Sequence, residues 1–219
     1  MALPILYSLQ HCPYAMRARM GILLAEQTVM LRAITMDNRP DEMLAASPKA
    51  TVPVLVLDDG SVIDESLDIM LWALKLNDPQ NLLLSDQVSA LPEMLKIINE
   101  NDKAFKPSLE NYKRAKRFHH DSEDSYRLEC EPFIQSLERR LTKHNFFMGP
   151  NPSLLDYVLL PFIRQFSKAN KPLFREGPYT LLQHWLDRHL QSRLFAKAMF
   201  KYPLWLESNE VYYLGKGEK

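Results

Sequence analysis

The pattern of apolar residues changes near residue 77, and this change constrains the fold more than any other feature of the chain. Before it, short apolar runs typical of strands alternate with segments of helical periodicity. After it, long amphipathic stretches follow one another with little alternation. A connector rich in Asn and Pro, residues 77–81, lies between the two patterns. We therefore expect two domains: an α/β domain over residues 1–76 and an all-helical domain over residues 82–219.

The alternation within the first domain predicts a mixed sheet covered by helices. Strands are expected at residues 3–9, 29–35, 52–57 and 61–63, and helices at residues 14–26, 39–47 and 65–76. The sequence Asp-Asp-Gly at residues 58–60 favours a hairpin turn between the last two strands. In the second domain, helices are expected at residues 88–105, 124–143, 153–169, 179–191 and 192–201. Ser153 and Asp156 form a capping-box pattern that favours a helix start.

Charge and cysteine content limit the functions open to the chain. The 27 basic residues balance 27 acidic ones, which gives no electrostatic case for binding nucleic acid or an acidic membrane. The two cysteines cannot form a disulfide framework and fit a reducing compartment. The chain has no apolar run near the roughly 20 residues that span a bilayer, and no signal-peptide pattern. We expect a soluble cytoplasmic protein without a metal centre, since its histidines and cysteines lack the spacing of metal ligands.

Cys12 is the residue most suited to chemistry. It stands directly before Pro13 at the expected start of a helix, and proline favours the first helical position. Free backbone N–H groups and the positive end of the helix dipole therefore face its sulfur, which favours the reactive thiolate. Arg17 and Arg19, within the next two turns, add positive potential. The alternative is a small apolar residue that fills a strand–helix junction.

The spacing of the cysteines indicates a mechanism with one thiol. A dithiol oxidoreductase carries Cys-x-x-Cys, but Ala15 occupies the fourth position here. The other cysteine, Cys130, lies far along the chain in a predicted helix, and we expect it to be a buried core residue. Without a nearby second thiol, Cys12 can still attack a mixed disulfide or carry a small thiol.

Three motifs resemble those of cytosolic glutathione transferases. They are His-Cys-Pro-Tyr at residues 11–14, Thr-Val-Pro-Val-Leu at residues 51–55 and Asp-Glu-Ser-Leu-Asp-Ile at residues 64–69. The Cys-Pro-Tyr-Ala sequence is most similar to the omega class and its glutaredoxin-like bacterial members. The resemblance covers nearly the whole chain. It implies a thioredoxin-like N-terminal domain, an all-helical C-terminal domain and glutathione as co-substrate.

The resemblance also implies where glutathione binds. It places a cis peptide bond before Pro53, so that the backbone of Val52 pairs with the cysteinyl part of glutathione as an added strand pairs with a sheet edge. The start of helix 65–76 suits the γ-glutamyl group, with Ser66 at its carboxylate and Glu65 at its ammonium. The alternatives are an ordinary proline at a strand entrance and plain helix capping.

Two cations are candidates for binding the glycyl carboxylate. Arg39 matches the position where omega-like proteins use a lysine, and Lys49 is the alternative. Either one also fits a solvated surface cation. Tyr14 is expected to pack or hydrogen-bond near the sulfur, and His11 is a neighbour that can tune it.

The single reactive cysteine favours a glutathione-dependent thiol transferase or reductase that acts on mixed disulfides or on a small acceptor such as dehydroascorbate. One alternative is a transferase that conjugates glutathione to apolar electrophiles. Conjugating classes use Tyr or Ser for this purpose, and here Tyr7 and Ser8 lie in the first strand while Cys12 occupies the turn. The other alternative is a non-catalytic binding or adaptor protein of the same fold.

The second substrate, a small disulfide or electrophile, is expected in a cleft between the domains. Candidate walls of that cleft are Phe105, Tyr112 and the region of Trp185. Helix 88–105 offers a face for a homodimer, and the last residues, 215–219, are expected to be loose.

Overall fold

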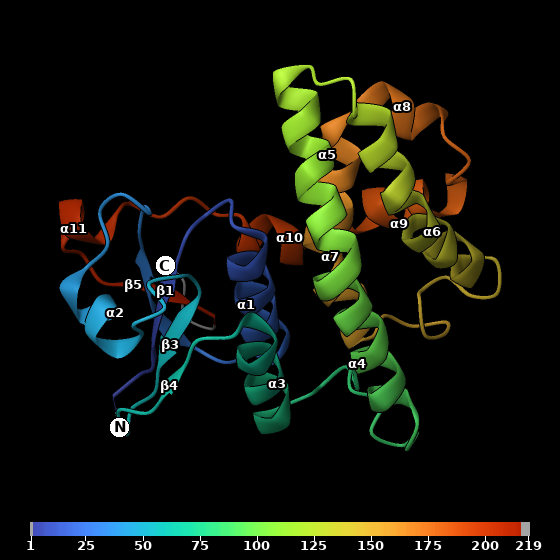
Figure 1. The fold of residues 1–219 in the computed structure, drawn as a ribbon. Helices are drawn as coiled ribbons and strands as arrows, with labels where there is room; N and C mark the ends of the chain where they lie inside the picture. The colour runs from blue at the N-terminus through green and yellow to red at the C-terminus, as the bar shows by residue number, and fades with distance from the viewer. Residues whose placement is uncertain (1, 216–219) are drawn as a thin grey trace. The chain divides into compact units, whose positions relative to one another are not determined.

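The computed structural model describes residues 2–215, and Figure 1 shows the path of the chain. The chain forms two compact units. The first contains the residues up to Gln80 together with those from Ser192 onward, and the second contains Asn81–Gln191. The first unit therefore draws on two segments that are more than a hundred residues apart in sequence. Of the predicted loose end, residues 216–219 lie outside the described residues.

Five strands form the sheet of the first unit, in the order β4-β3-β1-β2-β5. They are β1 (Ile5–Ser8), β2 (Val29–Ala33), β3 (Val54–Val56), β4 (Val62–Ile63) and β5 (Tyr212–Leu214). β1 runs parallel to β2, whereas the pairs β1–β3, β3–β4 and β2–β5 are antiparallel. This is the mixed sheet that the sequence predicts, with one additional strand.

Helices cover both faces of this sheet. In Figure 1, α1 (Pro13–Leu24) and α3 (Ser66–Leu76) lie on one side of it and α2 (Asp41–Ala46) lies on the other. α1 and α3 approach closely at Gly21, where a Cβ atom would lie 2.6 Å from Cγ of Met70. This close packing holds the middle of α3 against the last turn of α1.

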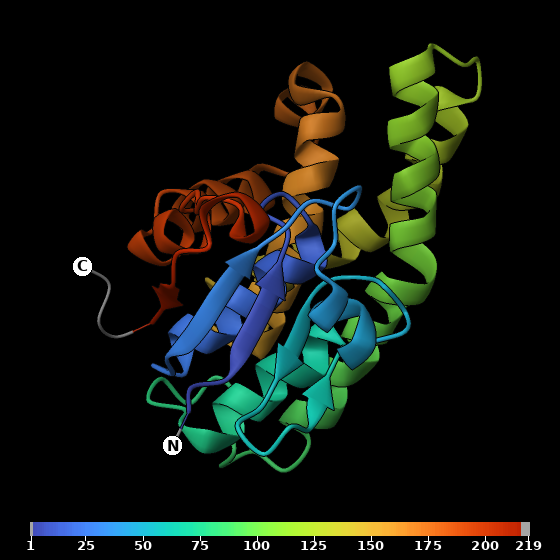
Figure 2. The same cartoon turned by 90° about the vertical axis from the view of Figure 1, so that its left-hand side faces the viewer.

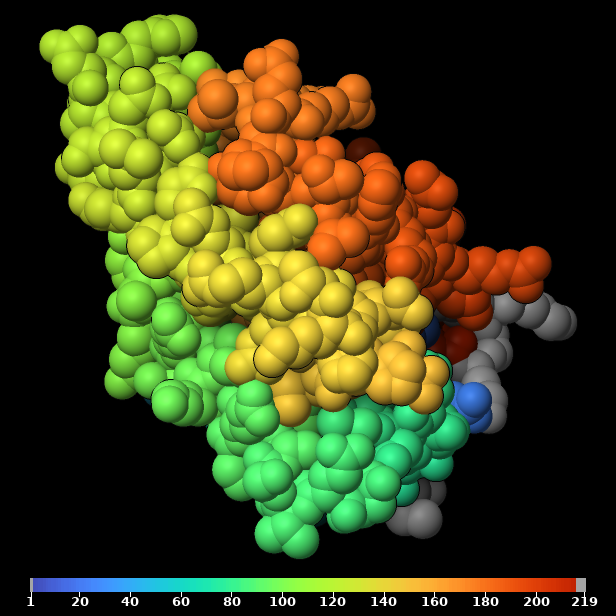
Figure 3. Space-filling view, turned by 90° about the vertical axis from the view of Figure 1, so that its right-hand side faces the viewer, coloured from blue at the N-terminus to red at the C-terminus, as the bar shows by residue number. Residues whose placement is uncertain are grey.

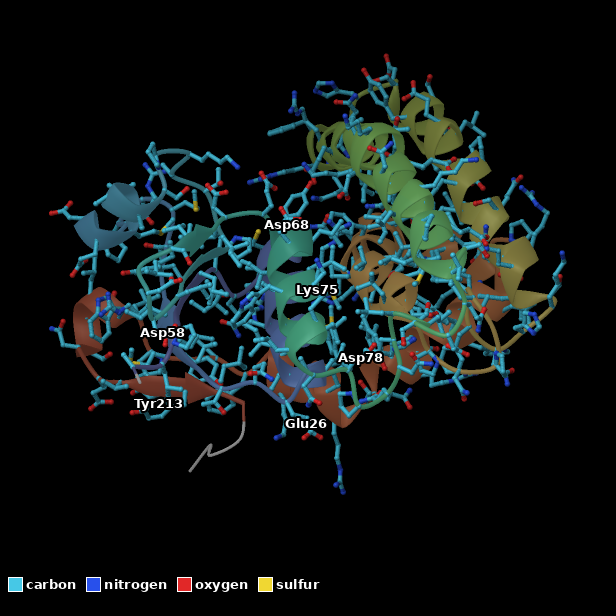
Figure 4. All side chains as sticks on the ribbon, turned by 90° about the horizontal axis from the view of Figure 1, so that it is seen from below. Glu26, Asp58, Asp68, Lys75, Asp78 and Tyr213 are labelled. Carbon is cyan, nitrogen blue, oxygen red and sulfur yellow. The ribbon has the colours of Figure 1, made fainter. Side chains whose placement is uncertain are left out.

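α3 illustrates how the sequence determines a helix and its orientation. Its buried residues recur with a helical period. They are Ser66, Ile69, Met70, Ala73 and Leu74. The charged residues Asp68 and Lys75 are exposed on the same helix, and Figure 4 shows their positions. One face of α3 therefore packs into the unit while the face that carries Asp68 and Lys75 stays at the surface.

The C-terminal segment differs from the prediction. We expected residues 82–219 to form one helical domain, but the chain returns to the first unit at Ser192. There α10 (Arg193–Ala198) packs on α1, and β5 pairs with β2. Figure 2 shows the red C-terminal strand beside β2.

A long-range contact explains this difference. β2 would otherwise be an edge strand, and β5 supplies it with backbone partners, Leu31 opposite Tyr212. Between α10 and β5, the short helix α11 (Trp205–Ser208) lies against the sheet, with the guanidinium of Arg32 4.2 Å from the centroid of the Trp205 ring. A strand of three residues is too short to show a period of two in the sequence.

The second unit consists of helices. They are α4 (Ala90–Glu100), α5 (Lys106–Phe118), α6 (Glu123–Leu141), α7 (Leu154–Ala169), α8 (Lys171–Glu176) and α9 (Thr180–Leu190). α7 forms the centre, since 11 of its 16 residues are buried. Figure 3 shows α6, in yellow, on one face of this unit. In the described part of the chain, none of the helices is both long enough and apolar enough to cross a membrane.

The predicted helix 88–105 is part of a longer one. A π-helical turn, Asn101–Phe105, joins α4 to α5 without a break. The sequence does not predict α5 because this helix is strongly polar: only Leu109, Tyr112 and Ala115 are buried along its length. These three residues stand three apart, so a narrow apolar stripe is enough to hold the helix on the core.

Candidate active site

Cys12 occupies the N-cap of α1, as predicted. Its backbone is extended, with φ −70° and ψ 125°, and Pro13 begins the helix. The amide of Cys12 donates to the carbonyl of Leu9 at 3.3 Å, and its own carbonyl accepts from the amide of Met16 at 2.9 Å. The half-buried sulfur therefore lies at the positive end of α1, where a negative charge is favoured.

The loop before β3 brings Val52 to this sulfur. The Val52–Pro53 bond is cis, as the resemblance implies. Sγ of Cys12 lies 3.9 Å from the carbonyl oxygen of Val52, close enough for a weak S–H···O hydrogen bond. Two motifs that are 40 residues apart in sequence thus meet at one point.

The N-terminus of α3 carries the acidic part of the site. Glu65 is the N-cap, Ser66 is the first helical residue, and the Glu65 side chain does not cap the helix. The carboxylate of Asp64 accepts from the hydroxyl of Ser47 at 2.7 Å. This hydrogen bond, together with the ammonium of Lys49, lowers the pKa of Asp64.

Lys49 and Arg39 have different partners. The ammonium of Lys49 lies 2.7 Å from Glu65 and 3.0 Å from Asp64, and these carboxylates raise the pKa of Lys49. Arg39 instead donates to the carbonyl of Ala50 at 2.9 Å. The structure therefore brings Lys49 and Glu65 together at the start of α3, and it uses Arg39 to hold the loop that leads to Val52.

The remaining predicted residues lie on α1 or just before it. Pro13 fixes the first turn. The ring of Tyr14 lies under the guanidinium of Arg17, with 5.5 Å between the guanidinium carbon and the ring centroid. His11 is exposed.

Tyr7 and Ser8, the two hydroxyl side chains of β1, are turned into the unit. Both are buried. The hydroxyl of Tyr7 accepts from Arg32 at 2.7 Å, and burial raises the pKa of Tyr7. The hydroxyl of Ser8 accepts from Arg19 at 2.5 Å. Both side chains thus serve internal hydrogen bonds with arginines.

A cavity of about 460 Å³ lies beside the turn that precedes Cys12. No sequence pattern indicates it, because its far wall is the C-terminal segment that we expected in the helical domain. Its walls come from the first unit: Ser8, Leu9, Gln10, His11, Arg19, Leu31, Ala33, Ile34, Thr35, Phe200, Lys201, Tyr202, Pro203, Leu204 and Glu207.

The aromatic residues expected in a substrate cleft belong instead to the core of the second unit. Phe105, Tyr112 and Trp185 are each 2% exposed or less. Cys130 is also fully buried, as predicted, and burial raises the pKa of its thiol to about 12. Residues 2–215 contain no group of three or more potential metal ligands.

Comparison with known proteins agrees with this arrangement. Residues 6–81 match the family model described as glutathione S-transferase, N-terminal domain, and residues 126–188 match glutathione S-transferase, C-terminal domain. The chain is 24% identical to glutathione S-transferase omega-1 of Mus musculus over 162 residues, 73% of this chain and 65% of that protein. It is 34% identical to glutaredoxin 2 of Escherichia coli K12 over 94 residues, 43% of each chain. The matches thus span less than two thirds of these relatives.

Solved structures show the same fold over nearly the whole chain. A glutathione transferase family member from Pseudomonas fluorescens Pf-5, with two glutathione bound, has a TM-score of 0.76 at 15% identity, covering 90% of this chain and 92% of that one. Glutathione transferase omega 3C from Trametes versicolor has a TM-score of 0.76 at 16% identity, covering 94% and 92%. A thioredoxin-like unit followed by a helical unit is what these proteins share with the chain. The protein belongs to the glutathione S-transferase superfamily and has omega-class and glutaredoxin-like relatives.

Proposed function

We propose that this protein is a glutathione-dependent thiol transferase in which Cys12 is the only catalytic thiol. The observation that carries the proposal is the position of Cys12: its half-buried sulfur lies at the N-cap of α1 and 3.9 Å from the carbonyl of Val52. A helix N-terminus stabilises a thiolate, and a thiolate is the form that attacks a disulfide. The other cysteine, Cys130, is buried in α6 and cannot serve as a resolving thiol.

The reaction proceeds by two thiol–disulfide exchanges. The Cys12 thiolate attacks the glutathionyl sulfur of a mixed disulfide, forms a Cys12–glutathione disulfide and expels the other half as a thiolate, which takes up a proton. The thiolate of a second glutathione then attacks the glutathionyl sulfur bound to Cys12. This step releases glutathione disulfide and restores the Cys12 thiolate. In sum, one mixed disulfide and one glutathione give one free thiol and one glutathione disulfide.

The groups around Cys12 suit the peptide that must be held there. The backbone of Val52, next to the sulfur, can pair with the cysteinyl residue of glutathione. The exposed Glu65, at the N-cap of α3, suits the ammonium of the γ-glutamyl group, and the backbone of Ser66, the first residue of that helix, suits its carboxylate. Lys49 or Arg39 supplies a cation for the glycyl carboxylate, and Arg39 is the better candidate because Lys49 is paired with Asp64 and Glu65.

Two features support thiol transfer over conjugation to electrophiles. The better-known conjugating classes use a Tyr or Ser hydroxyl to hold glutathione as a free thiolate, but here Tyr7 and Ser8 are buried and bonded to Arg32 and Arg19. In addition, a thiol at the N-cap position can take the glutathionyl group from a mixed disulfide by exchange, which expels the other half as a thiolate.

The test is the glutathione-dependent reduction of the mixed disulfide between glutathione and 2-mercaptoethanol. Wild-type protein is compared with Cys12→Ser and, as a matched control, with Cys130→Ser. We expect turnover in the wild type, loss of at least a hundredfold in Cys12→Ser, and nearly unchanged turnover in Cys130→Ser. A wild-type protein without turnover, or a fully active Cys12→Ser variant, would overturn the proposal. The same variants assayed with dehydroascorbate and with an aryl halide would separate a reductase from a conjugating enzyme.

A further inference from the structure

Arg19 is an unusual residue because its charged group lies inside the first unit. The residue is only 2% exposed. Its guanidinium donates to the carbonyls of Leu9 at 3.2 Å, Gln10 at 2.7 Å and Ala198 at 2.6 Å. Its other contacts are the Ser8 hydroxyl and, at 4.0 Å, the sulfur of Met199. These five acceptors account for the five N–H groups of an arginine.

All of these acceptors are neutral. Among the described residues, Arg19 contacts no carboxylate, so its positive charge is solvated by dipoles but not cancelled by an ion pair. A buried charge without a counter-charge is costly, and burial lowers the pKa of Arg19 to about 10. Among the charges that oppose this lowering of the pKa of Arg19, that of Cys12 has the largest effect.

Arg19 also acts on the backbone of Cys12. The Leu9 carbonyl that accepts from Arg19 is the same one that accepts from the Cys12 amide at 3.3 Å. Arg19 follows Cys12 by seven residues, about two helical turns, so both lie on one side of α1. The guanidinium thus fixes the turn that directly precedes Cys12. A planar group with five donors can bind several acceptors of this turn at once better than an ammonium can.

The C-terminal segment takes part in this arrangement. Arg19 holds the Ala198 carbonyl at the end of α10, and the Gln10 side chain donates to the Met199 carbonyl at 3.1 Å. One hydrogen bond thus joins the turn directly to Met199, 189 positions later, and Arg19, which binds the same turn, is bonded to Ala198, 179 positions later.

We propose that Arg19 is the positioning residue of the active site: its buried guanidinium fixes the Leu9–Gln10 turn against the end of α10 and places a positive charge without a counter-charge behind the turn that leads to Cys12. This inference rests on the proposed function only in assigning thiol transfer as the reaction of Cys12. The state of the thiol itself can be measured without glutathione.

The experiment measures the rate of Cys12 alkylation by iodoacetamide against pH, with the modified peptide followed by mass spectrometry. Arg19→Gln removes the charge, and we expect it to move the midpoint of the profile upward by about one pH unit. Arg19→Lys keeps the charge but loses the planar fork. We expect its midpoint within about 0.3 pH unit of the wild type, by the same reasoning, and its kcat for thiol transfer to fall roughly tenfold at unchanged KM for glutathione. Arg32→Gln is the matched control, because it removes an arginine of the same unit that does not contact the turn.

Each outcome decides the proposal. An Arg19→Gln profile that coincides with the wild type overturns it, and so does an Arg19→Gln shift no larger than that of Arg32→Gln. If Arg19→Gln does not fold, as judged by thermal unfolding, Arg19→Lys decides alone: a displaced profile or an unchanged kcat overturns it. A wild-type protein that lacks turnover, but whose profile moves in Arg19→Gln, would refute the proposed function and leave the role of Arg19 intact.

Discussion

The indole nitrogen of Trp185 donates a 2.9 Å hydrogen bond to the carboxylate of Asp156, and both residues are buried in the helical unit. The same carboxylate accepts from the backbone and hydroxyl of Ser153, each at 2.8 Å, and from the amide of Phe147 at 3.2 Å. The capping box that the sequence predicts is thus present. Through these hydrogen bonds, Asp156 also joins α7 to α9 and to the loop that precedes α7.

Replacement of Asp156 is expected to destabilise the helical unit. Asp156→Ala leaves the Trp185 and Phe147 N–H groups buried without an acceptor and removes a helix cap. We expect a loss of about 3 kcal/mol in the free energy of unfolding, measured by urea denaturation. Trp185→Phe removes one donor and keeps the carboxylate, so its loss should be smaller. An Asp156→Ala variant as stable as the wild type would contradict this account.

His189 makes stability depend on pH. Its ring packs against Trp185, Tyr157 and Phe146, at centroid distances of 4.7, 5.3 and 5.9 Å. Burial, assisted by Arg188, lowers the pKa of His189 from 6.5 to about 4. The unfolded chain therefore binds a proton more readily than the folded protein between these two values. This contribution to stability is complete above pH 6.5 and is lost as the pH falls toward 4, by about 2 kcal/mol between pH 7 and pH 5.

The measurement is urea denaturation at pH 7, 6 and 5, with His189→Phe as the comparison. Phenylalanine keeps a ring in the cluster but does not titrate, so its stability should fall less over this range. If both proteins lose stability in parallel, His189 is not the source of the effect.

Glu65 is expected to affect glutathione binding more than stability. Its pairing with Lys49 is exposed at both side chains, and such ion pairs contribute little to folding. A hydrogen bond to a ligand ammonium is stronger, so Glu65→Gln should raise the KM for glutathione roughly tenfold with little change in kcat. The unfolding midpoint should stay within error of the wild type. Equal KM values in the two proteins would show that the γ-glutamyl ammonium binds elsewhere.

Gly215 is expected to be necessary for docking β5. Its φ is +123°, and a Cβ atom there would clash with the carbonyl oxygen of Gln27. Gly215→Ala should therefore detach the strand, and hydrogen exchange at residues 212–214 should accelerate roughly tenfold or more. Gly60→Ala is the matched control, because Gly60 also has a positive φ, +84°, but a Cβ atom at Gly60 would meet no atom within 4 Å. Gly60→Ala should change the rate of hydrogen exchange only in the hairpin formed by β3 and β4.

The features of the fold and of the site that the sequence predicts are those that depend on neighbouring residues. Cys12 before Pro13, and Ser153 three residues before Asp156, specify helix starts through local backbone geometry alone. The resemblance to a known family adds Val52 and Pro53, which lie far from Cys12 in sequence but next to it in space.

What could not be predicted depends on partners far along the chain. Arg19 was expected to add positive potential, but its acceptors Ala198 and Met199 are about 180 residues away. A polar residue in a helix gives no sign of whether it will be solvated or buried. For the same reason, no local pattern indicated that Tyr212 would pair with Leu31.

The C-terminal strand has a consequence for the order in which the protein is made. A ribosome completes the first four strands and then the whole helical unit before β5 leaves the exit tunnel. Until then, the backbone groups along the outer side of β2 have no partner, and Arg19 lacks the Ala198 carbonyl. The turn that carries Cys12 is therefore completed only after the helical unit has been synthesised, although its own residues precede that unit in the chain.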